Sequence, residues 1–117
     1  MNVETAREYS LSKKATTEDM PFGDDFLTIR VMGKMFLCIS FNTPDRITMK
    51  CDPDYAIELR DHYNGVEGAW NFKKYWNQVF LDRDLDDKLI KQLIDHSYDE
   101  VIKKFPKKLR AEYDALP

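Results

Sequence analysis

The stretch "FLTIRVMGKMFLCISFNTPDRITMKC", residues 26–51, alternates apolar and polar residues with period two in three successive runs. Side chains of a β-strand point to opposite faces in turn, so the pattern predicts three strands that each bury one face. The apolar set is odd-numbered: Leu27, Ile29, Val31, Met35, Leu37, Ile39, Phe41, Ile47, Met49 and Cys51. The more polar set is even-numbered: Thr28, Arg30, Phe36, Cys38, Ser40, Arg46, Thr48 and Lys50. We expect a three-stranded antiparallel meander whose odd face is buried under helices.

The first turn of this meander has to keep odd residues opposite odd residues, because a slip of one residue would expose the whole apolar set. A three-residue loop over 32–34 meets this condition by pairing Val31 with Met35. The same assignment of faces puts Cys38 and Cys51 on opposite sides of the sheet, where they cannot form a disulfide. We therefore expect two free thiols, as in a reducing compartment.

Helical patterns flank the meander on both sides. Asn2 is placed to cap a helix over residues 3–14, and Asp52 to cap a second helix that ends near residue 64. The longest apolar stripe with helical spacing covers residues 86–105 and is interrupted by Pro106.

Shorter segments complete the order of elements. The prediction is a loop over 16–25, strands over 66–70 and 75–81 with a turn between them, and a last helix over 107–113. Helix, three strands, helix, two strands and two helices make one α+β domain over residues 1–117. Its antiparallel β-sheet is packed on one face by helices.

Composition and charge limit the classes of function. A hydrophobic fraction of 43% and a charged fraction of 33% are typical of a globular domain. The start, "MNVETAREYS", lacks the apolar core of a secretion signal, and no apolar run approaches the ~20 residues of a membrane span, so we expect a cytoplasmic protein without membrane association.

The net charge of −3 argues against a strongly basic nucleic-acid binder, but the charges are unevenly distributed. Residues 52–102 hold six basic and twelve acidic side chains, whereas residues 103–117 hold five basic and two acidic. A local basic patch is compatible with this distribution.

Several segments in the same order resemble the YjbR/MmcQ family of small bacterial proteins. They are "PFGDD" at 21–25, "VMGKMFLCI" at 31–39, "MKCDPDYAIELR" at 49–60, "KKYWNQVFLD" at 73–82 and "LIKQLIDHSYDEVIKKFPKKLR" at 89–110. The resemblance implies a fold similar to CyaY, which is frataxin-like. It also implies DNA binding through a "double wing" of two β-hairpins.

The residues that fit this implied function are basic side chains on the even face and at two hairpin tips. Lysines and arginines attract phosphates in a salt-dependent manner, and exposed aromatic rings can stack on unpaired bases. The candidate nucleic-acid-binding residues are Arg30, Lys34, Arg46, Lys50, Lys73, Lys74 and Tyr75. By contrast, Trp76 is assigned to the strand and to packing.

Three alternatives remain open at this stage. The same basic residues, or "KKFPKKLR" at 103–110, could bind an acidic protein partner or an anionic ligand instead of DNA. The acids at 82–87 could bind a metal, although they lack the glycine and distal glutamate of a calcium loop. His62 and His96 are the only histidines, and no catalytic motif accompanies them. We expect a non-enzymatic monomer without cofactor or bound metal.

Overall fold

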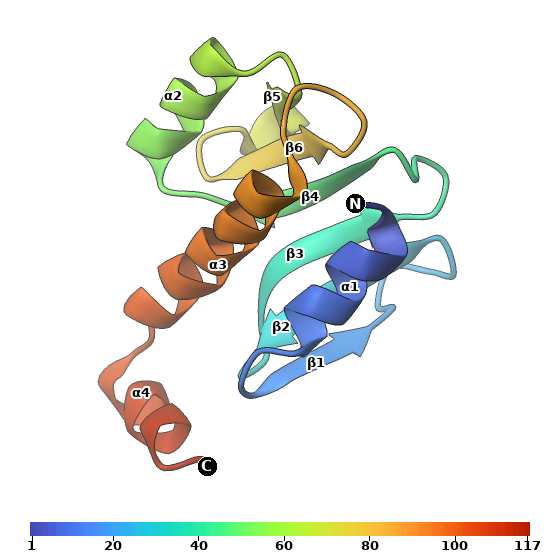
Figure 1. The fold of residues 1–117 in the computed structure, drawn as a ribbon. Helices are drawn as coiled ribbons and strands as arrows, with labels where there is room; N and C mark the ends of the chain where they lie inside the picture. The colour runs from blue at the N-terminus through green and yellow to red at the C-terminus, as the bar shows by residue number, and fades with distance from the viewer.

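The computed structural model describes the backbone of residues 1–117 and every side chain except that of Asn71. Its elements are, in chain order, α1 (Val3–Leu11), β1 (Thr16–Asp19), β2 (Phe26–Val31), β3 (Lys34–Ser40), β4 (Arg46–Lys50), α2 (Pro53–His62), β5 (Val66–Gly68), the 3-10 helix η1 (Trp70–Phe72), β6 (Trp76–Phe80), α3 (Asp87–Lys103) and α4 (Lys107–Asp114). The strands form one antiparallel sheet in the order β1-β2-β3-β4-β6-β5. Figure 1 shows α1 and α3 across the same face of this sheet, with α4 projecting beyond it. The predicted α+β class is confirmed.

Side-chain caps explain where the helices begin. Asn2 accepts a hydrogen bond from the backbone N–H of Thr5 at 2.8 Å, and Asp52 accepts one from Tyr55 at 3.1 Å, as predicted for both caps. Asp86 does the same for Leu89 at 2.8 Å, at the start of α3.

The first helix is shorter than predicted and ends at Leu11. Ala15, one residue beyond the predicted end, has a left-handed backbone with φ 61°, and there the chain turns into β1. The Thr16 hydroxyl also donates to the carbonyls of Leu11 and Lys13, at 3.1 and 2.8 Å. These two bonds satisfy carbonyls that a continuing helix would have used.

The core lies between the odd face of the meander and the helices. Ile29, Leu37, Ile39, Ile47 and Met49 are all buried, as the alternation predicted. From α3 they meet a buried apolar stripe: Ile90, Leu93, Ile94, Val101 and Ile102. The predicted free thiols of Cys38 and Cys51 are also confirmed, and both are buried.

Four of the ten residues of the predicted loop over 16–25 form a strand. β1 pairs with β2 from Thr16 opposite Val31 to Asp19 opposite Thr28. The segment "TTED" has no apolar alternation and is exposed after its first residue, so periodicity could not reveal it. Its pairing depends on the open edge of β2, which is a tertiary feature.

The predicted three-residue hairpin loop is wrong as well. Val31 pairs with Lys34, so the turn has two residues, Met32 and Gly33, with φ values of 50° and 80°. Positive φ at both positions suits the twist of a two-residue hairpin. A β-bulge then restores the odd pairing, because the register shifts between Ile29 and Arg30.

The bulge also corrects the predicted face of one even-numbered residue. Phe36 is fully buried and packs edge-on against Tyr98 of α3, with ring centroids 5.5 Å apart. Ser97 of α3 donates to the Phe36 carbonyl at 2.6 Å. Phe41, predicted on the buried face, is 48% exposed because β3 ends at Ser40.

Candidate functional site

Three lysines surround the ring of Tyr75, and these four residues are called the lysine–tyrosine cluster. The ammonium groups of Lys104, Lys74 and Lys50 lie 4.9, 5.4 and 5.7 Å from the ring centroid. They come from the C-terminal end of α3, the turn before β6 and the last residue of β4. These separations are within cation–π range of a tyrosine ring.

The sheet register explains why these elements meet. Lys50 lies opposite Trp76, and the Cys51 N–H donates to the Tyr75 carbonyl at 2.8 Å. β4 therefore ends where β6 begins, and α3 brings its last turn to the same place. Among the described residues, none of the three lysines forms a salt bridge with a carboxylate.

The three positive charges of the cluster have no salt bridge to a carboxylate among the described residues. Partial burial and the nearby charge of Lys104 lower the pKa of Lys50 below its ordinary value. Glu100 is close by but buried, and it forms its salt bridge with Lys103 at 3.3 Å. Such a cluster can attract an anion.

The segment 69–75, called the aromatic loop, connects β5 to β6 beside this cluster. Trp70 is 85% exposed and Phe72 is 70% exposed. The loop backbone is nevertheless closed by hydrogen bonds from Phe72 N–H to the Ala69 carbonyl at 2.9 Å and from Tyr75 N–H to the Phe72 carbonyl at 3.2 Å. Two aromatic rings are thus held in solvent by an ordered turn.

Arg60 of α2 fixes the far side of the aromatic loop. Its guanidinium donates to the Lys73 carbonyl at 2.7 Å and to Asn77 Oδ1 at 2.9 Å. A Cβ added at Gly68 would lie only 2.8 Å from the Lys73 Cβ, so β5 and the loop need a glycine there. The loop is held from α2, from β5 and within itself.

The remaining lysines at this end of the sheet add to its charge. The β2–β3 turn, the start of β1 and the end of β4 all lie here, since Thr16 pairs with Val31 and Val31 with Lys34. We call this the basic end; its lysines without a salt bridge among the described residues are Lys14, Lys34, Lys50, Lys73, Lys74, Lys104, Lys107 and Lys108.

The opposite end of the sheet, called the acidic end, is formed by the loops 20–25, 41–45 and 81–86. The loops are joined by hydrogen bonds from Phe41 N–H to the Asp25 carbonyl and from Leu81 N–H to the Asp45 carbonyl, both 2.9 Å long. The acids here are Asp24, Asp25, Asp45, Asp82, Asp84, Asp86 and Asp87.

The structure therefore divides the residues predicted from sequence. Lys50, Lys74 and Tyr75 come together, and Lys73 and Lys34 lie at the same end. Arg46, however, lies at the acidic end and pairs with Asp45 at 3.0 Å. Arg30 is occupied by Asp19, also at 3.0 Å. The even face does not present one basic surface.

Three of the four acids at 82–87 have structural partners: Asp84, Asp86 and Asp87. Asp84 accepts the backbone N–H groups of Asn64 and Gly65 at 2.8 and 2.7 Å, and these bonds lower its pKa although burial opposes them. Asp87 pairs with the N-terminal amine at 2.6 Å. Among the described residues, no group of three His, Cys, Asp or Glu side chains could hold a metal ion.

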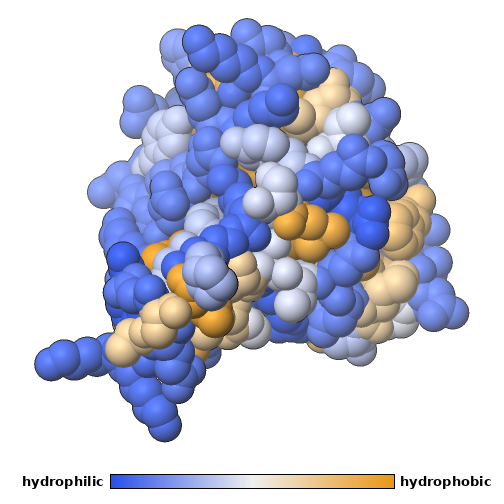
Figure 2. Space-filling model, turned by 60° about the horizontal axis from the view of Figure 1, so that its bottom comes forward, coloured by the Kyte–Doolittle hydropathy of each residue, from blue (hydrophilic) through white to orange (hydrophobic). Residues whose placement is uncertain are grey.

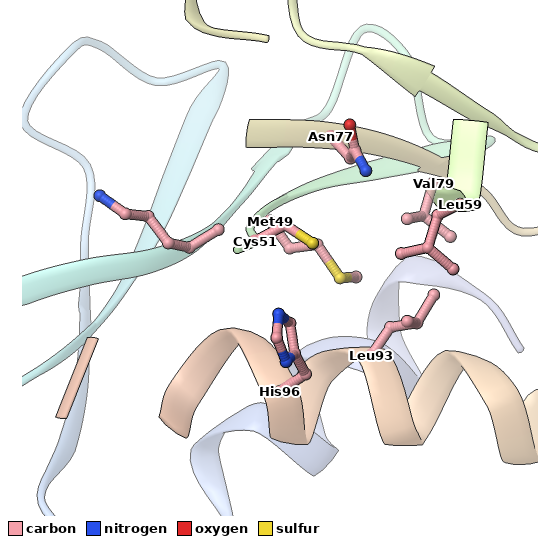
Figure 3. A pocket seen from close by; sticks show the side chains of 8 residues that line it. Met49, Cys51, Leu59, Asn77, Val79, Leu93 and His96 are labelled. Carbon is pink, nitrogen blue, oxygen red and sulfur yellow. The ribbon is translucent and has the colours of Figure 1, made fainter. Parts of the chain in front are cut away.

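A small cavity lies behind the cluster, between α3 and the sheet. Its volume is about 10 Å³, room for one water at most. Figure 3 shows His96 and Leu93 from α3 opposite Met49 and Cys51, with Asn77 at the rim. His96 Nε2 accepts the Asp52 N–H at 3.1 Å and lies 3.8 Å from Glu100 Oε1, so the imidazole is held between the start of α2 and its own helix. Burial raises the pKa of the Cys51 thiol to about 12. The residues that line the cavity therefore have structural roles, and their arrangement does not resemble a catalytic site.

The fold matches that of solved bacterial proteins. The crystal structure of Deinococcus radiodurans protein DR2400, from the family-model domain DUF419, superposes with a TM-score of 0.87 at 29% identity, covering 98% of this chain and 88% of that chain. A Pseudomonas syringae structure has a TM-score of 0.72 at 23% identity, covering 86% and 98%. The family model described as YjbR matches residues 11–100. The chain belongs to the YjbR family.

Two Escherichia coli relatives in this YjbR group have names that state no activity. The uncharacterised protein YjbR of strain K12 is 25% identical over 113 residues, covering 94% of this chain and 95% of the relative. The uncharacterised protein YbdF of O157:H7 is 26% identical over 101 residues, covering 85% and 83%. No enzyme name appears among these YjbR-family relatives.

Sequence reasoning missed two residues of the site in this YjbR-family chain, because Trp70 was assigned to a strand and Phe72 to a plain turn. Lys104 was considered only within the alternative binding segment 103–110, apart from Lys50 and Lys74. The available signal was the run "WNFKKYW", residues 70–76, in which two lysines lie between aromatic residues in a segment with no clear strand periodicity. The distance between residues 74 and 104 along the chain hid their meeting at Tyr75.

Proposed function

We propose that this YjbR-family protein binds nucleic acid through its basic end, in contact with the phosphate backbone. The observation that carries the proposal is the gathering of Lys50, Lys74 and Lys104 around Tyr75 without a carboxylate partner. Salt bridges neutralise many other basic groups, including Arg7, Lys13 and Arg46. Charge left unpaired in one place is what a polyanion needs.

The net charge of −3 does not oppose this proposal, because seven of the acids lie at the acidic end, away from the lysine–tyrosine cluster. The molecule extends 39 × 32 × 28 Å, whereas charges are screened beyond about 8 Å at physiological salt. A phosphate at the basic end therefore meets the local lysines and little of the distant acidic loops.

Two hairpins reach the basic end, and this arrangement supports the double wing implied by the family resemblance. One is β2–β3 with Lys34 at its tip, and the other is β5–β6 with the aromatic loop as its connection. Both support a nucleic-acid backbone running across this end, with Lys34 and Lys74 as separate phosphate contacts. Binding without catalysis accords with the structural roles of His96 and Cys51.

A protein partner with an acidic segment is the alternative use of the same lysines. It would require an apolar or shaped surface for specificity. The face in Figure 2 is mostly hydrophilic, with hydrophobic side chains in small separate patches. Nucleic acid needs no broad apolar face, so it is the better match.

The state of the two cysteines bears on the cellular location of the protein. No helix among the described residues is long and apolar enough to cross a membrane. Two buried free thiols accord with a reducing compartment, so we propose a cytoplasmic location.

The test is a titration of labelled DNA at 50, 100 and 200 mM salt (about these concentrations) with two matched double variants. Lys74→Ala with Lys104→Ala should weaken binding roughly tenfold and lower the salt slope by about 2. Lys88→Ala with Lys91→Ala removes the same charge from the other half of α3 and should change binding less than about twofold. Equal effects of the two pairs, or no DNA binding at low salt, would contradict the proposal.

A further inference from the structure

We infer that the aromatic loop stacks on unpaired bases, so that the protein prefers single-stranded nucleic acid to duplex. This inference rests on the proposed function and assigns the two rings that phosphate binding leaves unused. Trp70 is 85% exposed and Phe72 is 70% exposed, so both rings are open to a partner. The lysines beside them select a partner that is anionic and also has flat apolar groups.

The loop holds these rings outward at a cost to its own backbone. Trp70 has φ 50°, a left-handed conformation that bulky side chains seldom adopt. Strain of this kind persists only where surrounding contacts impose it, and it clusters at binding sites. Here the contacts are the backbone bonds within the loop and the Arg60 bond to the Lys73 carbonyl. A loop ordered before binding loses less entropy on binding.

The aromatic residues of the loop divide into two roles. Tyr75 is 37% exposed and has three lysine ammonium groups around its ring, so its faces are largely taken. Trp70 and Phe72 have no described cation–π or ring–ring contact. The lysine–tyrosine cluster thus serves the phosphates, and the two outer rings serve the bases.

The strand preference follows from where base faces are accessible. In a duplex each base face is covered by its neighbour, and the grooves show only base edges. A single strand exposes the faces, and stacking of an aromatic side chain on them tolerates any sequence. Rings that project from a basic surface can therefore stack on base faces only where the nucleotides are unpaired.

A matched control is present at the acidic end. Phe22 is exposed to the same fraction as Phe72, 70%, but it is followed after one glycine by Asp24 and Asp25. If exposed phenylalanine by itself drove association, both substitutions to alanine would act alike. Under the inference only the loop at the basic end matters.

The first experiment compares a thymidine oligonucleotide with a duplex that carries the same number of phosphates. The wild-type protein should bind the single strand at least about tenfold more tightly, a difference within the range for stacking of one or two bases. Trp70→Ala and Phe72→Ala should each weaken single-strand binding about five- to tenfold and duplex binding less than twofold. Phe22→Ala should change neither.

The second experiment uses tryptophan emission. The chain has two tryptophans, and Trp76→Phe leaves Trp70 as the fluorophore while keeping a ring at position 76. Stacking should quench this emission on addition of the thymidine oligonucleotide, and added salt should restore it. The duplex should quench it much less.

The outcomes separate the two claims. If the wild-type protein binds the single strand and the duplex equally tightly and Trp70→Ala changes neither affinity, the preference for single strands is overturned and nucleic-acid binding stands. Loss of all nucleic-acid binding overturns both. A blue shift of Trp70 emission with phosphatidylglycerol vesicles, without quenching by the oligonucleotide, assigns the loop to a membrane surface and overturns the inference.

Discussion

At the scale of single residues, the candidate site contains a lysine, Lys50, whose positive charge is disfavoured by its surroundings. Lys50 is partly buried and near Lys104, and both facts lower its pKa. Its protonated form is therefore less favourable in the folded protein than in the unfolded chain, and stability rises with pH as Lys50 loses its proton. A residue that costs stability and gathers positive charge is typical of a binding site.

We predict that Lys50→Met stabilises the protein at pH 7 and weakens DNA binding. The gain should be less than about 1 kcal/mol, because the group keeps much of its contact with solvent. Urea unfolding measures the gain, and the DNA titration measures the loss. A variant that is less stable than wild type would show that the cation–π contacts of the Lys50 ammonium group with Tyr75 and Trp76 outweigh the cost of its partial burial.

Asp95 provides the contrasting case of a favourable charge. Burial alone raises the pKa of Asp95, but hydrogen bonds from Lys13 and Tyr9 outweigh it and leave the pKa lowered. The carboxylate therefore adds stability above its unfolded pKa near 3.8, and that stability is lost as the pH falls through the folded value.

We predict that Asp95→Asn lowers stability at pH 7 by about 1 kcal/mol or less and that the difference disappears near pH 2. Thermal unfolding at both pH values measures it. Asp99→Asn on the same helix is the control, since Asp99 is exposed and has no described hydrogen bond. A constant deficit for Asp95→Asn at both pH values would contradict the linkage.

At the scale of elements, the β2–β3 hairpin is positioned by its bulge and not by its turn alone. The extra residue, Phe36, enters the core against Tyr98, and its carbonyl accepts the Ser97 hydroxyl at 2.6 Å. This bond is buried and joins α3 to β3 close to the hairpin that carries Lys34. The period-two pattern predicted the strands, but a bulge has no signature in such a pattern.

We predict that Ser97→Ala destabilises the protein by about 1–2 kcal/mol, because the Phe36 carbonyl loses its side-chain partner in a buried place. Ser12→Ala is the matched control, since the Ser12 hydroxyl donates to the Tyr9 carbonyl at the same 2.6 Å but in an exposed place. Its effect should be a few tenths of a kcal/mol. Urea denaturation of both variants measures the difference, and equal costs would contradict a special role for the buried bond.

At the scale of the whole molecule, the unpaired lysines of the basic end and the aspartates of the acidic end lie at opposite ends of the strands. Strand ends that are far apart in the chain share one end of the sheet, so that lysines from β3, β4, α3 and α4 gather opposite the acidic loops. The 39 Å length of the molecule decides when one end influences the other. At 0.15 M salt the screening length is about 8 Å, and at 0.01 M it is about 30 Å.

We predict that Asp24→Asn with Asp25→Asn leaves DNA affinity unchanged at 0.15 M salt and raises it about two- to threefold at 0.01 M. Repulsion from the acidic end reaches the DNA only when screening is weak. Titrations at the two salt concentrations measure the change. A gain of the same size at both would mean that these loops contact the DNA.

What the sequence by itself determined is the set of local choices. The alternation over 26–51 determined the strands and their buried face. Asn2 and Asp52 determined where two helices begin, and the motifs indicated the YjbR family. The tertiary structure alone decided β1, the bulge at Phe36, and the meeting of Lys50, Lys74 and Lys104. The physical reason is that periodicity and capping act over a few neighbouring residues, whereas edge pairing and charge clustering depend on which strand ends the sheet brings together. Arg46 and Lys50 stand at the two ends of β4, and the tertiary structure decides that Lys50 meets Lys74 and Lys104 around the Tyr75 ring.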